Sequence, residues 1–361
     1  NKVLDDMRGA DQVAELAREA KLEHRKEELL EMGRSCLEAK EFPKGKSVLR
    51  RVVEEFGGEP GLKTEVGRML LKAGLYFEAG EALEEALAEM RRIQNALSPA
   101  IPGSQTHRIN TMAGEAPVEV SPECFHLLQR AVLISKLTEG AFDMTLGALD
   151  SLWRFDGSMR RLPDATSINA LISLVGYRQV VLDPEARTVF LPRRGMRIGL
   201  EAILRGYAAD RAKALMLARG VPGGMINAGG VVTAWGAKSS GEKWMLGVAD
   251  PKNTGKVHRW LPLIESSVAM VQTQKRFVRM GDRTYGHVLD PRNGYPVEGI
   301  RQVVVLSRTA EFSHALATAL CALGPARGIR LVEQLGDTEA IIVDTDGLMF
   351  WTRGLLPDPG R

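Results

Sequence analysis

The chain has 361 residues, of which 44% are hydrophobic and 26% charged, as in globular proteins long enough for two or three domains. Its 48 basic and 45 acidic residues give a net charge of only +3, which argues against the strongly basic proteins that bind nucleic acid or anionic membrane surfaces. No run of 18 or more apolar residues occurs, so we expect no transmembrane segment, while Asn at position 1 leaves room for a preceding signal peptide or lipid anchor.

Residues 1–92 predict only helices, and they contain an internal repeat of 34 residues. Five pairs of similar residues lie at that offset: Gly33 and Gly67, Ala39 and Ala73, Phe42 and Tyr76, Leu49 and Leu83, and Val53 and Leu87. The pattern resembles the tetratricopeptide (TPR) repeat, with hairpins over about 28–57 and 62–92 after a helix over about 10–28. A generic helical bundle is the alternative. Stacked helix pairs offer a groove for a partner's helix or peptide, so we expect residues 1–92 to bind protein subunits of a larger complex.

Residues 93–361 show a different pattern, in which short apolar runs alternate with helical segments, and this predicts an α+β domain. The predicted helices are Pro122–Leu137, Ala165–Leu174, Arg205–Arg219, Ser313–Leu323 and Ala326–Leu335. The predicted strands are Gln179–Leu182, Thr188–Leu191, Gly224–Ala228, Trp244–Val248, Ser267–Val271, Arg276–Arg279, Gln302–Leu306 and Ala340–Asp344. Glycine-rich turns, instead of a single phosphate-binding loop, join these elements.

Several motifs of this second region follow one another in a fixed order. They are Glu139–Gly147 (EGAFDMTLG), Gly199–Asp210 (GLEAILRGYAAD), Ile226–Val231 (INAGGV), Ala269–Gln272 (AMVQ), His287–Pro296 (HVLDPRNGYP) and Ser313–Leu320 (SHALATAL). Their order resembles that of the FAD:protein FMN transferases, the ApbE family, over residues from about 90 to 361. The resemblance implies a flavin-binding α+β fold of mixed sheets with packed helices. It also implies that FAD is cleaved with the help of Mg²⁺ and that FMN is attached through phosphate to a Thr or Ser of a partner protein.

The resemblance assigns candidate residues to three roles. For catalysis it points to His287 and Asp210, which would help remove the proton of the acceptor hydroxyl. The flavin nucleotide would contact Tyr207, Asn227, Gly229, Gly230, Arg205 and Asp290, since glycines let the backbone approach a diphosphate closely. The metal would be held by the backbone carbonyl of Leu204 together with His314 and Thr318, which lie on one face of a helix turn.

The chain also departs from the family's pattern at several of these places. His314 stands where the family has its metal-binding Asp, and an imidazole is a poor ligand for Mg²⁺. Glu201-Ala202 replace a Gly-Gly pair, and Met270-Val271-Gln272 replace Thr-Ser-Gly. Because these changes affect one pocket, we expect a degenerate metal site of low occupancy, with FAD as the cofactor that the pocket could still bind.

The sequence therefore favours a catalytically silent or impaired ApbE-like protein. It would serve as a scaffold or accessory subunit of a redox or electron-transfer complex at the cell envelope, on the periplasmic side, and bind its partners through residues 1–92. The alternative is an active FAD:protein FMN transferase that uses Mg²⁺ or another divalent metal. We expect no nucleic acid among its partners.

Overall fold

The computed structural model describes residues 21–56, 66, 69, 77–238, 240–249, 257–281 and 283–355. It divides into two compact units, Asn1–Glu84 and Glu85–Arg361. The division falls inside helix α4 (Phe77–Leu97). The second half of α4 belongs to the second unit because Ile93 and Leu97 are fully buried in its core.

The first unit contains a helical hairpin, formed by a helix over residues 21–38 and by α2 (Phe42–Phe56). Leu49 and Val52 are fully buried, and they share one face of α2 because they are three positions apart. A Cβ at Gly33 would lie 2.7 Å from Cγ of Leu49, so the two helices approach closely where a small residue was predicted. The second predicted hairpin depends on Gly67, Ala73 and Tyr76, which lie outside the described residues, so the 34-residue repeat stays a prediction.

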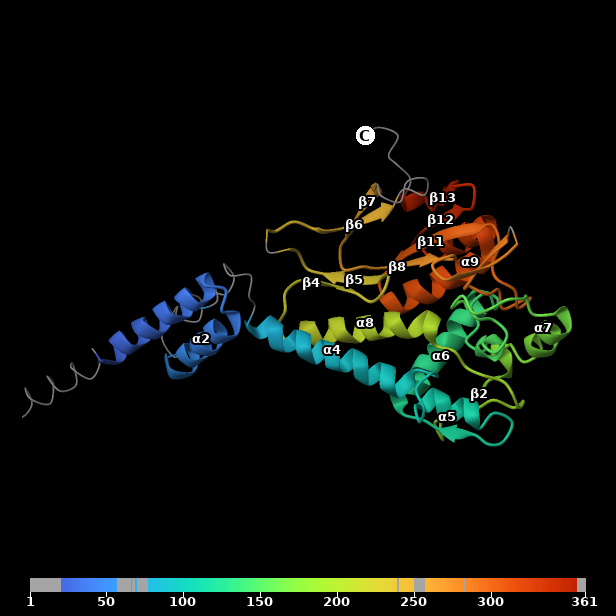
Figure 1. Ribbon diagram of the computed structural model, residues 1–361, viewed down its shortest axis with the longest axis horizontal. Helices are drawn as coiled ribbons and strands as arrows, with labels where there is room; N and C mark the ends of the chain where they lie inside the picture. The colour runs from blue at the N-terminus through green and yellow to red at the C-terminus, as the bar shows by residue number, and fades with distance from the viewer. Residues whose placement is uncertain are drawn as a thin grey trace, which may run out of the picture. The chain divides into compact units, whose positions relative to one another are not determined.

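The second unit combines helices with antiparallel sheets, as in the predicted α+β class (Figure 1). After α4, its elements in chain order are α5 (Gln105–Thr111), β1 (Val118–Glu119), α6 (Pro122–Leu137), α7 (Ala165–Ile172), β2 (Val181–Asp183), β3 (Thr188–Phe190), α8 (Glu201–Ala218), β4 (Gly224–Asn227), β5 (Val231–Trp235), β6 (Trp244–Ala249), β7 (Val257–Leu263), β8 (Ser267–Gln272), β9 (Phe277–Met280), β10 (Arg283–Gly286), β11 (Ile300–Ser307), α9 (Ala310–Glu333), β12 (Glu339–Asp344) and β13 (Met349–Trp351). Short 3₁₀ turns occur at Gly147–Leu149, Tyr177–Gln179 and Arg353–Leu355.

The largest sheet has six strands in the order β13-β12-β11-β8-β5-β4. Alternate residues of its central strand β11 enter two different cores, because successive side chains of a strand point to opposite faces. Val303 and Val305 pack with Leu316 of α9, whereas Val304 packs with Leu261 of β7. The sheet is therefore covered by α9 on one face and by the β6–β7 hairpin on the other.

Helices α8 and α9 cross in direct contact, and this crossing positions most of the predicted site residues. A Cβ at Gly206 would collide with the carbonyl group of Ala310 and lie 2.6 Å from Cα of Glu311. Helix α9 is kinked at Gly324, which has φ +74° and precedes Pro325, so two predicted helices form one bent element. By length and composition α9 could cross a membrane, but its buried residues lie in the cores that it shares with α8 and the sheet.

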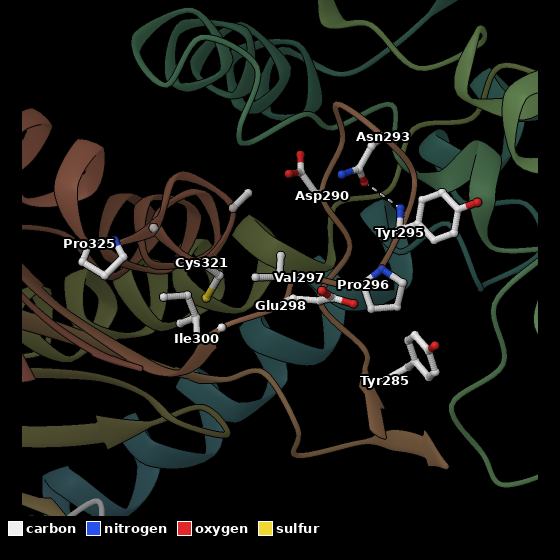
Figure 2. A pocket seen from close by; sticks show the side chains of 13 residues that line it. Tyr285, Asp290, Asn293, Tyr295, Pro296, Val297, Glu298, Ile300, Cys321 and Pro325 are labelled. Carbon is white, nitrogen blue, oxygen red and sulfur yellow. Dashed lines mark hydrogen bonds between the residues drawn. The ribbon is translucent and has the colours of Figure 1, made fainter. Parts of the chain in front are cut away.

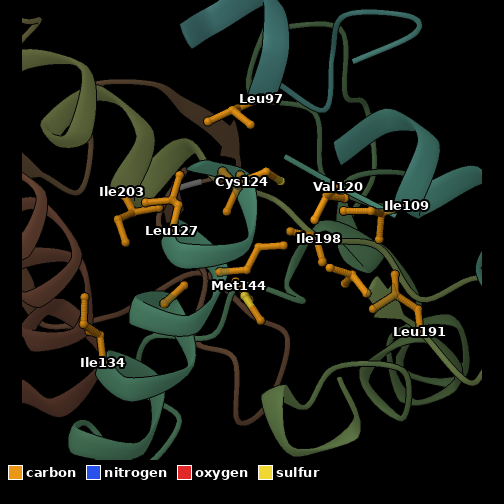
Figure 3. Packing of buried hydrophobic residues seen from close by; sticks show 14 of the residues in the cluster. Leu97, Ile109, Val120, Cys124, Leu127, Ile134, Met144, Leu191, Ile198 and Ile203 are labelled. Carbon is orange, nitrogen blue, oxygen red and sulfur yellow. The ribbon is translucent and has the colours of Figure 1, made fainter. Parts of the chain in front are cut away.

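A separate hydrophobic core fills the space between α6, α8 and the three-stranded sheet β1-β3-β2 (Figure 3). Leu127 and Ile203 are fully buried in it. Helix α6 has the predicted bounds because its start is encoded locally: Ser121 accepts a hydrogen bond from the backbone N–H of Cys124, and Pro122 occupies the first helical turn. The structure adds strands that were not predicted, namely β1, β5, β7, β10 and β13.

Candidate functional site

The polar groups of the His287–Pro296 turn are mostly hydrogen-bonded to one another. The carboxylate of Asp290 accepts hydrogen bonds from the backbone N–H of Arg292 at 2.9 Å and from its guanidinium at 2.8 and 2.6 Å. The same guanidinium donates to the carbonyl of Ala322 beside the kink of α9. Trp153 donates its indole N–H to the carbonyl of Gly294 at 2.9 Å. Asp290, predicted to bind the flavin nucleotide, is thus engaged in shaping the turn.

His287, at the start of this segment, has one ring nitrogen held by a hydrogen bond, while the other forms none with the described residues. Its Nδ1 lies 3.1 Å from the carbonyl oxygen of Thr273, an acceptor that requires the proton to sit on Nδ1. The lone pair is then on Nε2, which can accept a proton from a substrate. Burial and the nearby charge of Arg276 lower the pKa of His287, so the imidazole is neutral at neutral pH. These are the properties of a general base.

Arg205 reaches from α8 to the glycine turn between β4 and β5. One of its guanidinium nitrogens lies 3.4 Å from the carbonyl oxygen of Gly229, which is a weak hydrogen bond. Asn227 holds the turn by accepting a hydrogen bond from the N–H of Gly230 at 3.0 Å. Gly229 and Gly230 have φ of +68° and +103°, values that few residues besides glycine adopt. Burial, followed by the charge of Arg276, lowers the pKa of Arg205, so the two guanidinium charges act on each other.

His314 is buried in α9 next to this cationic group. It is only 4% exposed, and its Nδ1 forms no hydrogen bond within the described part of the chain. Burial, followed by the charge of Arg205, lowers its pKa to about 3, so the ring is neutral at physiological pH. The hydroxyl of Thr318 donates to the carbonyl of His314 at 3.0 Å, which turns it toward its own helix.

The predicted metal site does not fit Mg²⁺. This ion prefers oxygen ligands in octahedral geometry, whereas the site offers a neutral imidazole, a hydroxyl bound to its own helix and a neighbouring guanidinium. Leu204, whose carbonyl was predicted as a ligand, lies within α8, and its side chain packs on the core between α6, α8 and the sheet β1-β3-β2. Across the part of the chain that the structure describes, no three His, Cys, Asp or Glu side chains gather as a metal-binding group.

Asp210 and Tyr207 form hydrogen bonds within the framework of the unit, and their roles in catalysis and nucleotide binding stay predictions. Both carboxylate oxygens of Asp210 accept hydrogen bonds from the start of α9, from the N–H of Ala310 at 2.9 Å and of Glu311 at 2.8 Å. The hydroxyl of Tyr207 donates to Glu123 of α6 at 2.7 Å. Since residues two and five positions apart lie on different faces of a helix, neither side chain shares the face of Arg205.

The surroundings of Glu201 and the place of Arg276 beside His287 were not predicted from the sequence. Glu201 is exposed. Burial raises the pKa of Asp150 to about 6, and the negative charge of Glu201 adds to this rise, so Glu201 acts on Asp150. Arg276 was predicted only as the start of a strand. It is exposed in the turn before β9, and its carbonyl accepts a hydrogen bond from the backbone N–H of His287 at 3.0 Å. No local motif marks Arg276 as a site residue, because the β9–β10 hairpin brings it to His287.

An open cavity of about 470 Å³ lies between the His287–Pro296 turn and the kinked part of α9 (Figure 2). Asp290, Tyr295 and Glu298 line it from the turn side, and Cys321 and Pro325 line it from the kinked part of α9. Aromatic rings flank the turn: the ring centroid of Trp153 is 6.2 Å from that of Tyr295 and 6.5 Å from that of Tyr285, and the ring of Phe155 is 6.5 Å from that of His287.

Comparisons with known proteins agree on one family. A model of the ApbE family matches residues 64–342. A curated FAD:protein FMN transferase of Klebsiella pneumoniae is 32% identical over 267 residues, which cover 72% of this chain and 83% of that protein. A second one, of Treponema pallidum, is 28% identical over 294 residues and 77% of this chain.

Solved structures show the same fold. The ApbE protein of Thermotoga maritima is 29% identical, with a TM-score of 0.70 over 76% of this chain and 89% of that one. The flavinyl transferase ApbE of Pseudomonas stutzeri, in its apo form, is 26% identical, with a TM-score of 0.68 over 76% of this chain and 87% of that one.

Proposed function

The chain belongs to the ApbE family, and from this premise we propose that it is an FAD:protein FMN transferase. It would bind FAD and move the FMN moiety onto a Thr or Ser hydroxyl of a partner protein. The observation that carries the proposal is the pairing of a base with a cationic region: the Nε2 of His287 is free to accept a proton, and the charges of Arg205 and Arg276 act on this histidine.

In the transfer of FMN, the residues of the site have three tasks. The acceptor hydroxyl oxygen attacks the phosphorus of the FMN half of FAD, a new P–O bond forms, and the bond to the AMP phosphate breaks. His287 takes the hydroxyl proton, and AMP leaves with the electron pair of the broken bond. Arg205 and Arg276 stabilise the negative charge on the phosphate oxygens, and the turn at Gly229–Gly230 lets the backbone come close to them. No step is assigned to Mg²⁺, because the residues present do not fit that ion.

A second candidate function is a catalytically silent, flavin-binding scaffold. The observation that favours it is the imidazole of His314 in place of the family's metal-binding carboxylate, in a buried position beside Arg205. In this hypothesis the fold keeps the flavin and does not cleave it. The protein would then serve as an accessory subunit of an electron-transfer complex.

Both candidate functions require a protein partner. We propose that the helical region over residues 1–92, with its TPR-like pattern, recruits this partner and that residues 93–361 act on it or hold it. We also propose a location on the periplasmic side of the cell envelope. Fractionation of cells that carry an epitope-tagged chain tests the location, and recovery of the protein in the cytoplasm alone would contradict it.

Incubation with FAD and an acceptor peptide that contains one Thr separates the two functions. A transferase produces FMN-peptide and AMP in equal amounts, and a peptide with Val in place of Thr gives neither. A scaffold retains FAD and releases no AMP. Mass spectrometry of the peptide and chromatography of the nucleotides measure both outcomes.

A further inference from the structure

We propose that this chain holds the diphosphate of its flavin nucleotide through Arg205, Arg276 and His314, without a divalent cation. The inference rests on the proposed function, because it concerns the same site. It differs from what the family resemblance implies, since there Mg²⁺ assists the cleavage of FAD. The chemical class of the ligand is an organic diphosphate that carries an aromatic base.

The first argument is the balance of charge at the site. Among the described residues neither Arg205 nor Arg276 forms an ion pair with a carboxylate, whereas nine other arginines of this unit do. Asp290, the acidic residue of the adjacent turn, is already engaged by Arg292 at 2.6 Å. Glu201 attracts Arg205, but this attraction is smaller than the opposing effects of burial and Arg276. The region therefore carries positive charge that a diphosphate would neutralise.

The second argument is the unpaired nitrogen of His314. Buried polar groups in folded proteins nearly always have a hydrogen-bond partner, so an exception calls for one. The Nδ1 of His314 is the one buried side-chain nitrogen or oxygen without a partner among the residues that the structure describes. Arg205 is the charged group that acts on this ring, so an anion held by Arg205 would lie close to it. With its proton on Nδ1, the neutral ring donates a hydrogen bond to a phosphate oxygen.

The third argument is that a cation is disfavoured at the same place. Mg²⁺ loses its bound waters reluctantly, and it binds to proteins through carboxylates and substrate phosphates. Here the charge of Arg205 acts on the position of the missing carboxylate, and a guanidinium and a metal cation at one site repel each other. Guanidinium groups recognise phosphate with two parallel hydrogen bonds, so two arginines supply both the charge and the geometry that the metal would have given.

Binding of FAD to the full chain tests this inference apart from activity. Quenching of flavin fluorescence is titrated in EDTA and then in Mg²⁺. We expect the same affinity in both buffers within about twofold, since no metal takes part. Arg205→Gln and Arg276→Gln should each weaken binding by about tenfold to a hundredfold, the range for hydrogen bonds to a charged group. The control Arg330→Gln, an exposed arginine beyond the kink of α9, should leave the affinity unchanged.

Two substitutions of His314 make the inference sharper. His314→Asp introduces the carboxylate that the family has, so its binding of FAD should fall in EDTA and recover with Mg²⁺. His314→Asn keeps a neutral donor and should bind with or without metal, at an affinity within about tenfold of the parent chain. Circular dichroism confirms that each variant is folded, and His314→Asn carries the test if His314→Asp is not.

The outcomes separate the two proposals. If the parent chain binds FAD only with Mg²⁺, the metal-free site is wrong and the transferase proposal stands. If Arg205→Gln binds as well as the parent chain in EDTA, the arginine-based site is also wrong. If FAD binds in neither buffer, the proposed function fails together with the inference.

Discussion

Asp210 and His314 lie on the two helices that cross in the second unit, and their polar atoms are treated in opposite ways. Asp210 of α8 has both oxygens bound to backbone N–H groups of α9. His314, one turn after Ala310 in α9, has a buried nitrogen that no described residue bonds. The first arrangement is complete without a ligand, whereas the second is complete only when something donates to or accepts from the ring. The comparison separates residues whose hydrogen bonds hold α8, α9 and α6 together, called the frame below, from a residue whose buried nitrogen is unsatisfied among the described residues.

The frame around Asp210 extends to α6. Arg130 donates to Glu311 at 2.6 and 2.9 Å, and its guanidinium lies 5.5 Å above the ring of Tyr207. Glu123 accepts from Tyr207 and from Arg92 of α4. Every polar group in this series has a partner within the fold. None of the corresponding contacts reaches Arg205 or His314 among the described residues, so changes in the frame and in the site should have different readouts.

The largest effect is expected from a change that breaks the frame itself. Gly206→Val places a branched side chain against the backbone of Ala310, so α8 and α9 must separate. The free energy of unfolding should fall by about 3 kcal/mol or more, the upper end for overpacking, because backbone cannot move aside as a side chain can. Urea denaturation measures it. The control Leu217→Ala, at an exposed position of the same helix, should change it by about 0.5 kcal/mol or less.

The next largest effect concerns catalysis alone. His287→Gln should lower the rate of FMN transfer by about a hundredfold to ten-thousandfold, the usual contribution of a general base. Its affinity for FAD should stay close to that of the parent chain. A rate that stays within a factor of two would remove His287 from the mechanism.

The same residue predicts the dependence of the rate on pH. A base must be deprotonated, and the pKa of His287 is lowered from its ordinary value of 6.5 by burial and by Arg276. The acidic limb of kcat/KM should therefore lie below pH 6.5, with the rate falling only as the pH drops through the lowered pKa. An acidic limb above that value would contradict the environment assigned to His287.

A smaller effect is expected at the anchor of α9. Asp210→Ala should cost about 1 kcal/mol of unfolding free energy, as the loss of a helix cap does. Burial raises the pKa of Asp210 to about 6, from 3.8 in a model peptide, so the folded state binds this proton more tightly than the unfolded state. Stability from this group is then present at low pH and falls as the pH rises from about 4 to about 6. Asp210→Asn should remove that part of the pH dependence, which thermal unfolding at several pH values measures.

The smallest effect is expected at Tyr207, where a change in the frame should alter stability and leave the affinity for FAD unchanged. Tyr207→Phe removes one hydrogen bond to Glu123 and should cost about 1 kcal/mol of stability. The affinity for FAD should not change, although the sequence predicted that Tyr207 contacts the flavin nucleotide. A tenfold loss of FAD affinity in this folded variant would place Tyr207 in the site.

Much of the fold was predictable because its signals are local or periodic. The bounds of α6 follow from Ser121 and Pro122, and the buried strands β8, β11 and β12 follow from short apolar runs. The strands β7 and β13 were missed because each is defined by pairing with another strand. The start of α8 was also missed, since Leu200 supplies no side-chain cap that would mark it.

The site was predictable in part, for a related reason. His287 and Arg205 belong to motifs with a family resemblance. The backbone N–H of His287 donates to the carbonyl of Arg276, whose charge also acts on Arg205. Arg276 carries no such signal, because its position depends on the β9–β10 hairpin. Asp210 and Tyr207 were assigned to the site because they share a motif with Arg205, yet the helix turns them to other faces. Nearness in sequence therefore predicted the neighbourhood and not the direction of each side chain.

The most direct test of the account is a single-turnover reaction of the full chain with FAD and a Thr-containing acceptor protein. The products are measured by intact mass spectrometry of the acceptor and by quantification of AMP. The account predicts one FMN moiety added to the acceptor and an equal amount of AMP released, both strongly reduced in His287→Gln. An unchanged acceptor mass and no AMP, with FAD still bound to the chain, would contradict it and favour the silent scaffold.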